Sequence, residues 1–167
     1  MPNHKTYFDN DVKIGKQGER IFVEDFLEFN NIEYIDVSAS THWRKRGVDF
    51  ITSGGVSYEV KYSYKKKGYL QIEENADIIT DSEGWIYTTQ AEIVVFVSPE
   101  RAMIMLRLSD EFHEHYKAIK DNYETKNNRP STRNGIDTWQ SSYKEVPISD
   151  LKEFCAYYKK AHAISPQ

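Results

Sequence analysis

The segment that most constrains the fold is 47–61, in which two alternating apolar–polar stretches flank a short turn. Apolar residues stand at 48 and 50 and again at 56, 58 and 60, with polar residues between them. Such alternation is typical of a strand with one buried face. Ser53-Gly54-Gly55 lies between the two stretches and suits a tight hairpin turn. We therefore predict strands over 47–52 and 56–63 that pair as a hairpin with a common apolar face.

The rest of the chain predicts a mixed α/β (α+β) fold. Ile and Val, with 15 and 10 residues, outnumber the 5 Leu, and 12 Tyr add to this strand-favouring composition. Apolar periodicity predicts helices over 13–30, 109–123 and 149–161, strands over 32–37, 69–72, 91–97, 102–108 and 146–148, a helical turn over 76–82, and a long loop over 127–142. We expect a single domain, 1–167, with a core over about 13–108 and a C-terminal helix-loop-helix extension over about 109–167.

Membrane and disulfide-stabilised classes are disfavoured. The longest apolar run, Ile93 to Val97, is far shorter than the roughly 20 residues that span a bilayer. Residues 1–11 contain no apolar stretch of the signal-peptide type. The single Cys155, expected in the core, excludes an intrachain disulfide and a Cys-based zinc site. We therefore expect a cytoplasmic protein with neither a membrane partner nor a small-molecule cofactor.

The charge is unevenly distributed along the chain. A net charge of −4 disfavours a nucleic-acid binder. Residues 41–70, however, contain seven basic and only two acidic residues. Aromatic residues are interleaved with these cations, a combination that suits phosphate contact and base stacking. The predicted nucleic-acid-binding residues here are Trp43, Arg44, Lys45, Arg46, Lys65, Lys66 and Lys67.

Two carboxylates and a lysine occupy the polar face of the predicted hairpin. Glu59 and Lys61 are two residues apart on one strand, or about 6.6–6.8 Å, and can address one bound group. Asp49 is expected to join them from the neighbouring strand. Carboxylates beside a backbone carbonyl suit Mg²⁺ or Mn²⁺, which can activate water and polarise a phosphate. An ordinary solvated strand face has the same spacing, so the spacing alone leaves both interpretations open.

With these residues the sequence resembles the PD-(D/E)XK nuclease superfamily. Asp49 and Glu59-Val60-Lys61 match its signature, with Val48 where the family often has Pro. Glu19, in the first predicted helix, stands where the family often has an acidic residue facing the metal. Residues 13–70, about a third of the chain, are most similar to archaeal-type Holliday junction resolvases, including a Ser-containing loop over 38–40. The resemblance implies a restriction-endonuclease-like core with a mixed central sheet flanked by helices, divalent-metal-dependent phosphodiester hydrolysis, and frequently a homodimer.

The resemblance also implies roles for individual residues. Asp49 and Glu59 would bind the metal with the Val60 carbonyl, and Glu19 would assist directly or through water. Lys61 would orient the attacking water or stabilise the transition state. Arg20 and Ser40 would join the basic residues in contacting DNA.

The expected function is a Mg²⁺-dependent endodeoxyribonuclease, and the resemblance to junction resolvases implies structure-specific cleavage. The alternatives are a non-catalytic DNA- or protein-binding module that retains the nuclease fold, and a nuclease-like subunit that needs a partner for targeting. Arg129, Arg133 and Trp139, in the predicted long loop, would form a second DNA contact, a dimer arm or a surface loop.

Overall fold

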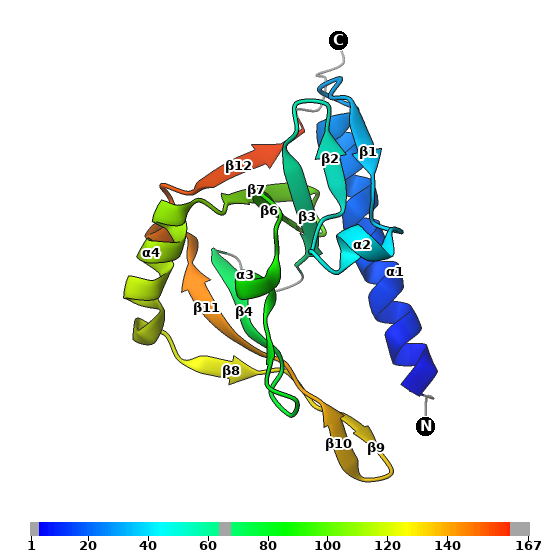
Figure 1. Cartoon of the computed structure of the whole chain (residues 1–167). Coiled ribbons are helices and arrows are strands. Elements are labelled where there is room, and N and C mark those ends of the chain that lie inside the picture. The colour runs from blue at the N-terminus through cyan, green and yellow to red at the C-terminus, as the bar shows by residue number, and fades with distance from the viewer. Residues whose placement is uncertain (1–3, 64–67, 161–167) are drawn as a thin grey trace, which may run out of the picture.

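The computed structural model describes residues 4–63 and 68–160, and it shows a mixed α/β fold (Figure 1). A six-stranded sheet, a four-stranded sheet and a two-stranded hairpin form its β-structure. Within the described ranges, no helix is long and apolar enough to cross a membrane.

The six-stranded central sheet has the order β1-β2-β3-β6-β7-β12. These strands are β1 (Tyr34–Asp36), β2 (Phe50–Thr52), β3 (Ser57–Tyr62), β6 (Ile93–Val97), β7 (Ala102–Arg107) and β12 (Cys155–Lys159). The β3–β6 pair is parallel and the other neighbours are antiparallel, so the sheet is mixed. The predicted hairpin is confirmed, because Phe50 lies opposite Tyr58 and Ile51 opposite Ser57.

One face of the central sheet packs against the first helix. Helix α1 (His4–Phe22) continues into a π-helical segment, η1 (Val23–Leu27). Phe22 and Leu27 are fully buried against side chains of β2, β3, β6 and β7. Because side chains alternate along β6, Val95 and Val97 join this core while Val94 and Phe96 face the other side. The predicted helix over 13–30 therefore exists, but it begins earlier and ends sooner.

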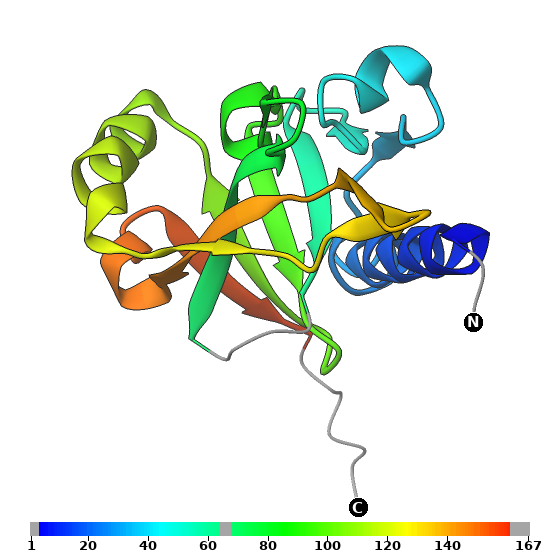
Figure 2. The same cartoon turned by 90° about the horizontal axis from the view of Figure 1, so that it is seen from below.

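The opposite face is covered by the four-stranded sheet and one helix. That sheet has the order β5-β4-β11-β8 and comprises β4 (Tyr69–Asp77), β5 (Ser82–Glu83), β8 (Thr125–Asn127) and β11 (Ser142–Pro147). Leu70, Ile72 and Val146 pack with Phe96 and with helix α4 (Asp110–Ile119) in a second core. Figure 2 shows β8 and β11 running across this side of the molecule. Ser109 caps α4, because its Oγ accepts a hydrogen bond from the Phe112 N–H at 3.2 Å.

Short helical segments connect these elements. They are α2 (Thr41–Arg44), α3 (Trp85–Thr88), η2 (Lys120–Asn122) and η3 (Ile148–Leu151). Helix α3 lies in the crossover between the parallel strands β3 and β6.

Two of the predicted helical elements are wrong. The last helix is only the short η3, and Cys155–Lys159 forms strand β12 along the open edge of β7. The predicted helical turn over 76–82 instead contains the end of β4 and a turn to β5, where Asp77 accepts the Ile79 N–H. The predicted extension is therefore helix followed by strands, and part of it completes both sheets.

The prediction of a long loop over 127–142 is also wrong. It contains a hairpin of β9 (Ser131–Arg133) and β10 (Ile136–Trp139), which projects beyond the four-stranded sheet (Figure 1). Asn134 and Gly135 form its turn with positive φ angles of 54° and 77°. Asn and Gly adopt these angles at low cost, which is why the pair supports a tight hairpin.

Candidate active site

Asp49 lies beside the part of β3 that extends beyond β2. Its backbone N–H donates to the Tyr58 carbonyl at 2.8 Å, and its Oδ2 accepts the Val60 N–H at 2.8 Å. The N–H and C=O of a strand residue point to the same edge, so the Val60 carbonyl also faces this side. The predicted association of Asp49 with the third strand is thus observed, although Asp49 immediately precedes β2 rather than lying within it.

Glu59 and Lys61 lie together on the polar face of β3. One carboxylate oxygen of Glu59, Oε1, forms an ion pair with Lys61 Nζ. Glu59 as a whole is only 7% exposed, and its other carboxylate oxygen, Oε2, is buried. This oxygen has no hydrogen-bond partner among the described residues. Leaving a buried acceptor unsatisfied costs free energy, so this oxygen is ready to bind an external donor or a cation.

Burial and two neighbouring carboxylates raise the cost of ionising Asp49. Burial raises the pKa of Asp49 to about 6, the Val60 N–H opposes this rise, and the charges of Glu19 and Glu59 add to it. A cation placed among these groups would relieve the repulsion.

The donor set fits Mg²⁺ better than a metal that needs an all-protein cage. Among the residues that the structure describes, no three His, Cys, Asp or Glu side chains form a ready-made metal group. Asp49, Glu59 Oε2 and the Val60 carbonyl offer only oxygen. Mg²⁺ commonly binds through one or two carboxylates and keeps several waters, which agrees with this arrangement.

Glu19 reaches the site because α1 approaches β3 closely. A Cβ on Gly18 would lie 3.0 Å from the Tyr62 Cβ, so a larger residue would push the helix away from the strand. Glu19 is partly buried, with its side chain 17% exposed, and its Oε2 lies 2.5 Å from Lys16 Nζ. Lys16 also donates to the Ser38 Oγ at 2.9 Å, which joins the helix to the loop after β1. Glu19 is therefore held at the edge of the site, near enough to affect Asp49.

Gly47 and Thr89 form a support that sequence reasoning missed. Gly47 has a φ of +63°, and a Cβ there would lie 2.8 Å from the Thr89 Oγ1 and 3.1 Å from the Glu59 Oε2. Thr89 Oγ1 donates to the Gly47 carbonyl at 3.1 Å. The glycine just before Val48-Asp49 was a usable signal, whereas Thr89 is distant in the sequence and gave none.

Glu73 and Trp85 also adjoin the site and were not predicted to do so. Lys61 Nζ lies 5.8 Å from the centroid of the Trp85 ring. Glu73 Oε1 accepts the Trp85 backbone N–H at 3.3 Å. Burial raises the pKa of Glu73, while the charge of Lys61 lowers it. Trp85 is buried in the second core, and its ring also lies close to Lys61.

The basic segment 42–46 immediately precedes the carboxylates. Trp43 and Arg44 belong to α2, which begins after Ser40 and lies between β1 and β2 in the chain. Arg44 and Lys45 are exposed, whereas Arg46 is half-buried and donates to the His42 carbonyl at 3.0 Å. The side chains of Arg44 and Lys45 are therefore open to solvent, and both residues are close to Asp49 in the sequence.

The other predicted nucleic-acid contacts are placed differently. Arg20 is exposed on α1 and lies 3.6 Å from Glu24, along the helix. The predicted contacts Lys65, Lys66 and Lys67 lie outside the described residues. The geometry thus joins Glu19, Asp49, Glu59, Val60 and Lys61 in one site.

No protein-family model matches the chain, and no curated protein matches it significantly.

Proposed function

We propose that this chain is a metal-dependent DNA nuclease with a restriction-endonuclease-like core and a PD-(D/E)XK mechanism. One observation carries the proposal: the buried Glu59 Oε2 has no hydrogen-bond partner among the described residues and lies in the cluster of Asp49, Lys61 and Glu19. A surface ion pair would leave both carboxylate oxygens in water. Here one oxygen is held by Lys61 and the other is kept dry and unused.

The residues of the site divide the work between them. Asp49, Glu59 and the Val60 carbonyl would hold Mg²⁺, which supplies a Lewis acid for a phosphate oxygen and an acidified water. The Val60 N–H fixes the Asp49 carboxylate. Lys61, positioned by Glu59, places positive charge where negative charge develops on the phosphate. Glu19 orients water at the edge of the site, and Arg44 and Lys45 contact the DNA backbone.

Cleavage assays with four substrates test the proposal. Plasmid, linear, single-stranded and branched DNA are incubated with Mg²⁺, Mn²⁺ or EDTA. We expect cleavage with either metal and none with EDTA. Lys61→Ala and Asp49→Asn should each lower the rate by about 100-fold or more, since each removes charge used in the transition state. Lys117→Ala, on the exposed face of α4, is the matched control and should cut like the wild type.

Metal binding is measured separately by calorimetric titration with Mn²⁺. The wild type should bind, and Glu59→Gln should bind much more weakly. DNA binding without cleavage, together with no Mn²⁺ binding, would reject the nuclease and favour a non-catalytic module. Sedimentation with DNA also tests the homodimer that the family resemblance implies.

A further inference from the structure

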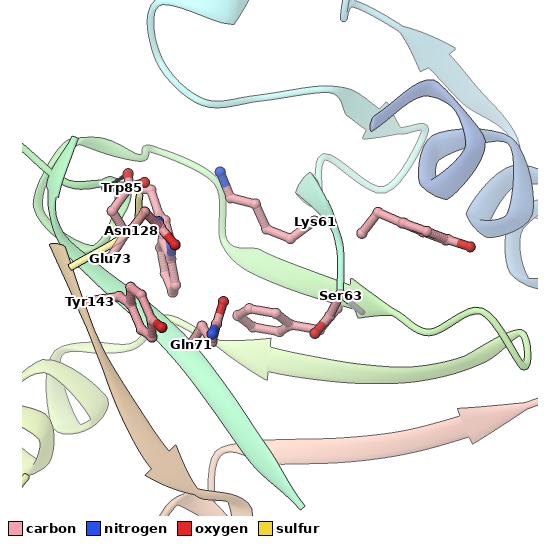
Figure 3. A pocket seen from close by; sticks show the side chains of 9 residues that line it. Lys61, Ser63, Gln71, Glu73, Trp85, Asn128 and Tyr143 are labelled. Atoms are coloured by element: carbon pink, nitrogen blue, oxygen red, sulfur yellow. Dashed lines mark hydrogen bonds between the residues drawn. The ribbon is translucent and has the colours of Figure 1, made fainter. Parts of the chain in front are cut away.

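A small pocket adjoins the candidate active site between the two sheets. It has a volume of about 200 Å³ and shares Lys61 with the active site (Figure 3). The remaining lining residues are Tyr62, Ser63, Gln71, Glu73, Trp85, Phe96, Asn128 and Tyr143. Pockets that hold drug-sized ligands are usually about 300–1,000 Å³, so this one suits a single ring system.

The four-stranded sheet directs three polar or aromatic side chains toward this pocket. Along β4, Leu70 and Ile72 are buried in the second core, so Gln71 and Glu73 project from the opposite face. On β11, Tyr143 is the cross-strand partner of Glu73 and projects from that same face. The strand registers therefore place these groups together, facing Lys61 across the pocket (Figure 3).

The lining combines flat aromatic surfaces with two polar groups, the Gln71 amide and the Glu73 carboxylate, that can form further hydrogen bonds. Trp85 and Phe96 form part of the wall, with ring centroids 5.8 Å apart. The Gln71 Nε2 is buried and has no hydrogen-bond partner in the described structure. Glu73 uses one carboxylate oxygen for the Trp85 N–H at 3.3 Å, and that bond is long.

These groups match the chemistry of a nucleobase. Aromatic side chains stack on any base, while amide and carboxylate groups bind the donors and acceptors along its edge. Lys61 contacts both the pocket and the candidate metal ligands, so a base bound here would belong to a nucleotide next to the reacting phosphate. A base in a continuous duplex is stacked and paired, so moving it into a pocket costs free energy that an unpaired base does not require.

We propose that this pocket binds an unstacked base beside the scissile phosphate, so that the enzyme selects DNA with unpaired nucleotides, such as branches and single strands. The inference rests on the proposed nuclease function, because it takes the substrate to be DNA bound at Lys61.

Base insertion is measured with the full chain in EDTA, so that no cleavage is needed. Flapped DNA carries 2-aminopurine at each unpaired position near the branch, and its fluorescence is followed during binding. We expect a change at one or two positions, and tighter binding of flapped than of continuous duplex DNA. Tyr143→Ala and Gln71→Leu should weaken flap binding by about fivefold or more, the scale of one lost base contact. Tyr157→Ala, at a residue 67% exposed on β12, is the aromatic control.

An abasic nucleotide at the responsive position completes the test. The effect of Tyr143→Ala should then disappear, because the base that it contacts is missing; thermal melts of the variants check folding. Equal binding of flapped and continuous DNA, or no fluorescence change at any position, would reject base binding in the pocket. Metal-dependent cleavage in the same preparation would still support the nuclease. A base-dependent signal without metal-dependent cleavage would support the pocket and reject the nuclease.

Discussion

The carboxyl group of Asp49 shows how a candidate metal ligand can oppose folding. Its pKa is raised to about 6, chiefly by burial and in part by Glu19 and Glu59. A group that binds its proton more tightly in the folded protein stabilises the fold only when protonated. Without metal, this contribution is full below about pH 4, the ordinary Asp range, and is lost as the pH rises through 6.

Asp49→Asn should therefore stabilise the metal-free protein at neutral pH. The amide oxygen can still accept the Val60 N–H, while the buried charge is removed. We expect the free energy of unfolding at pH 7 to rise by up to about 3 kcal/mol, with the difference vanishing near pH 4. Urea denaturation in EDTA across pH 4–8 measures it. Asp121→Asn, at an exposed position, should change little, and a variant no more stable than the wild type at pH 7 would contradict the prediction.

Gly47→Ala should damage the site and the fold together. The alanine would have to adopt the positive φ of Gly47, and its Cβ would crowd Thr89 Oγ1 and Glu59 Oε2. We expect a loss of about 2 kcal/mol in unfolding free energy and slower cleavage. Gly15→Ala provides the contrast, because a Cβ there meets nothing within 4 Å in the helix and should stabilise by about 0.5–1 kcal/mol. Chemical denaturation of both variants separates the two cases; equal effects would refute this role for Gly47.

At the scale of elements, one ion cluster joins the first helical segment to the turn after β6. Asp25, in η1, is only 4% exposed. Arg101 binds it through two hydrogen bonds, from Nε at 2.6 Å and from Nη2 at 2.7 Å. The Tyr158 hydroxyl donates to the Asp25 carbonyl at 2.8 Å, which adds β12 to the same junction. This cluster holds α1, and with it Glu19, against the central sheet.

Arg101→Ala should loosen that junction. The buried Asp25 carboxylate would lose its bidentate partner, and Lys160, at 3.8 Å, is too distant to replace it. We expect a loss of about 2 kcal/mol in unfolding free energy, below the range for fully buried pairs because the Arg101 side chain is 41% exposed. Arg107→Ala is the matched control, since its 3.5 Å pair with Glu92 is exposed and should contribute under about 1 kcal/mol. Thermal melts that gave equal losses would show that Asp25 does not depend on Arg101.

For the whole molecule, the acidic surface and the basic segment would have separate effects on the proposed binding of DNA. The net charge is −4, yet cations are concentrated in the sequence over 41–70, the segment that contains Asp49, Glu59 and Lys61. Phosphate contacts release counterions, so binding through this segment should weaken steeply with salt. The acidic remainder should repel DNA and confine it to one face.

The double substitution Arg44→Gln, Lys45→Gln should reduce the salt dependence of binding. Each lost phosphate contact lowers the slope of log affinity against log salt concentration by about 0.9 on duplex DNA, so we expect a fall of about 2. Fluorescence anisotropy at several salt concentrations measures it. Lys117→Gln, Lys152→Gln removes equal charge at exposed positions elsewhere and should leave the slope nearly unchanged. An equal fall in both variants would mean that net charge, rather than the basic segment, controls binding.

The local pattern of residues 47–61 was sufficient to predict the β2–β3 hairpin and the common polar face of Glu59 and Lys61. Alternation along a strand determines which side chains share a face, and Gly54-Gly55 permits the turn. The Ser109 cap of α4 was predictable for the same reason, since a cap is a contact between residues three apart. The nuclease chemistry itself stays a prediction.

Contacts between distant segments were decided by the tertiary structure alone. Residues 155–159 have apolar spacing that also fits a helix, but the open edge of β7 offers backbone hydrogen bonds that favour a strand. The packing of two sheets and a helix brings three sets of distant residues together. Gly18 approaches Tyr62, and Thr89 binds the Gly47 carbonyl. Glu73 and Tyr143 line the same pocket as Lys61. Periodicity reports which face of an element is apolar, but it does not report which partner will cover that face. The sequence by itself therefore determined the strands and residues of the candidate site, and packing decided what surrounds it.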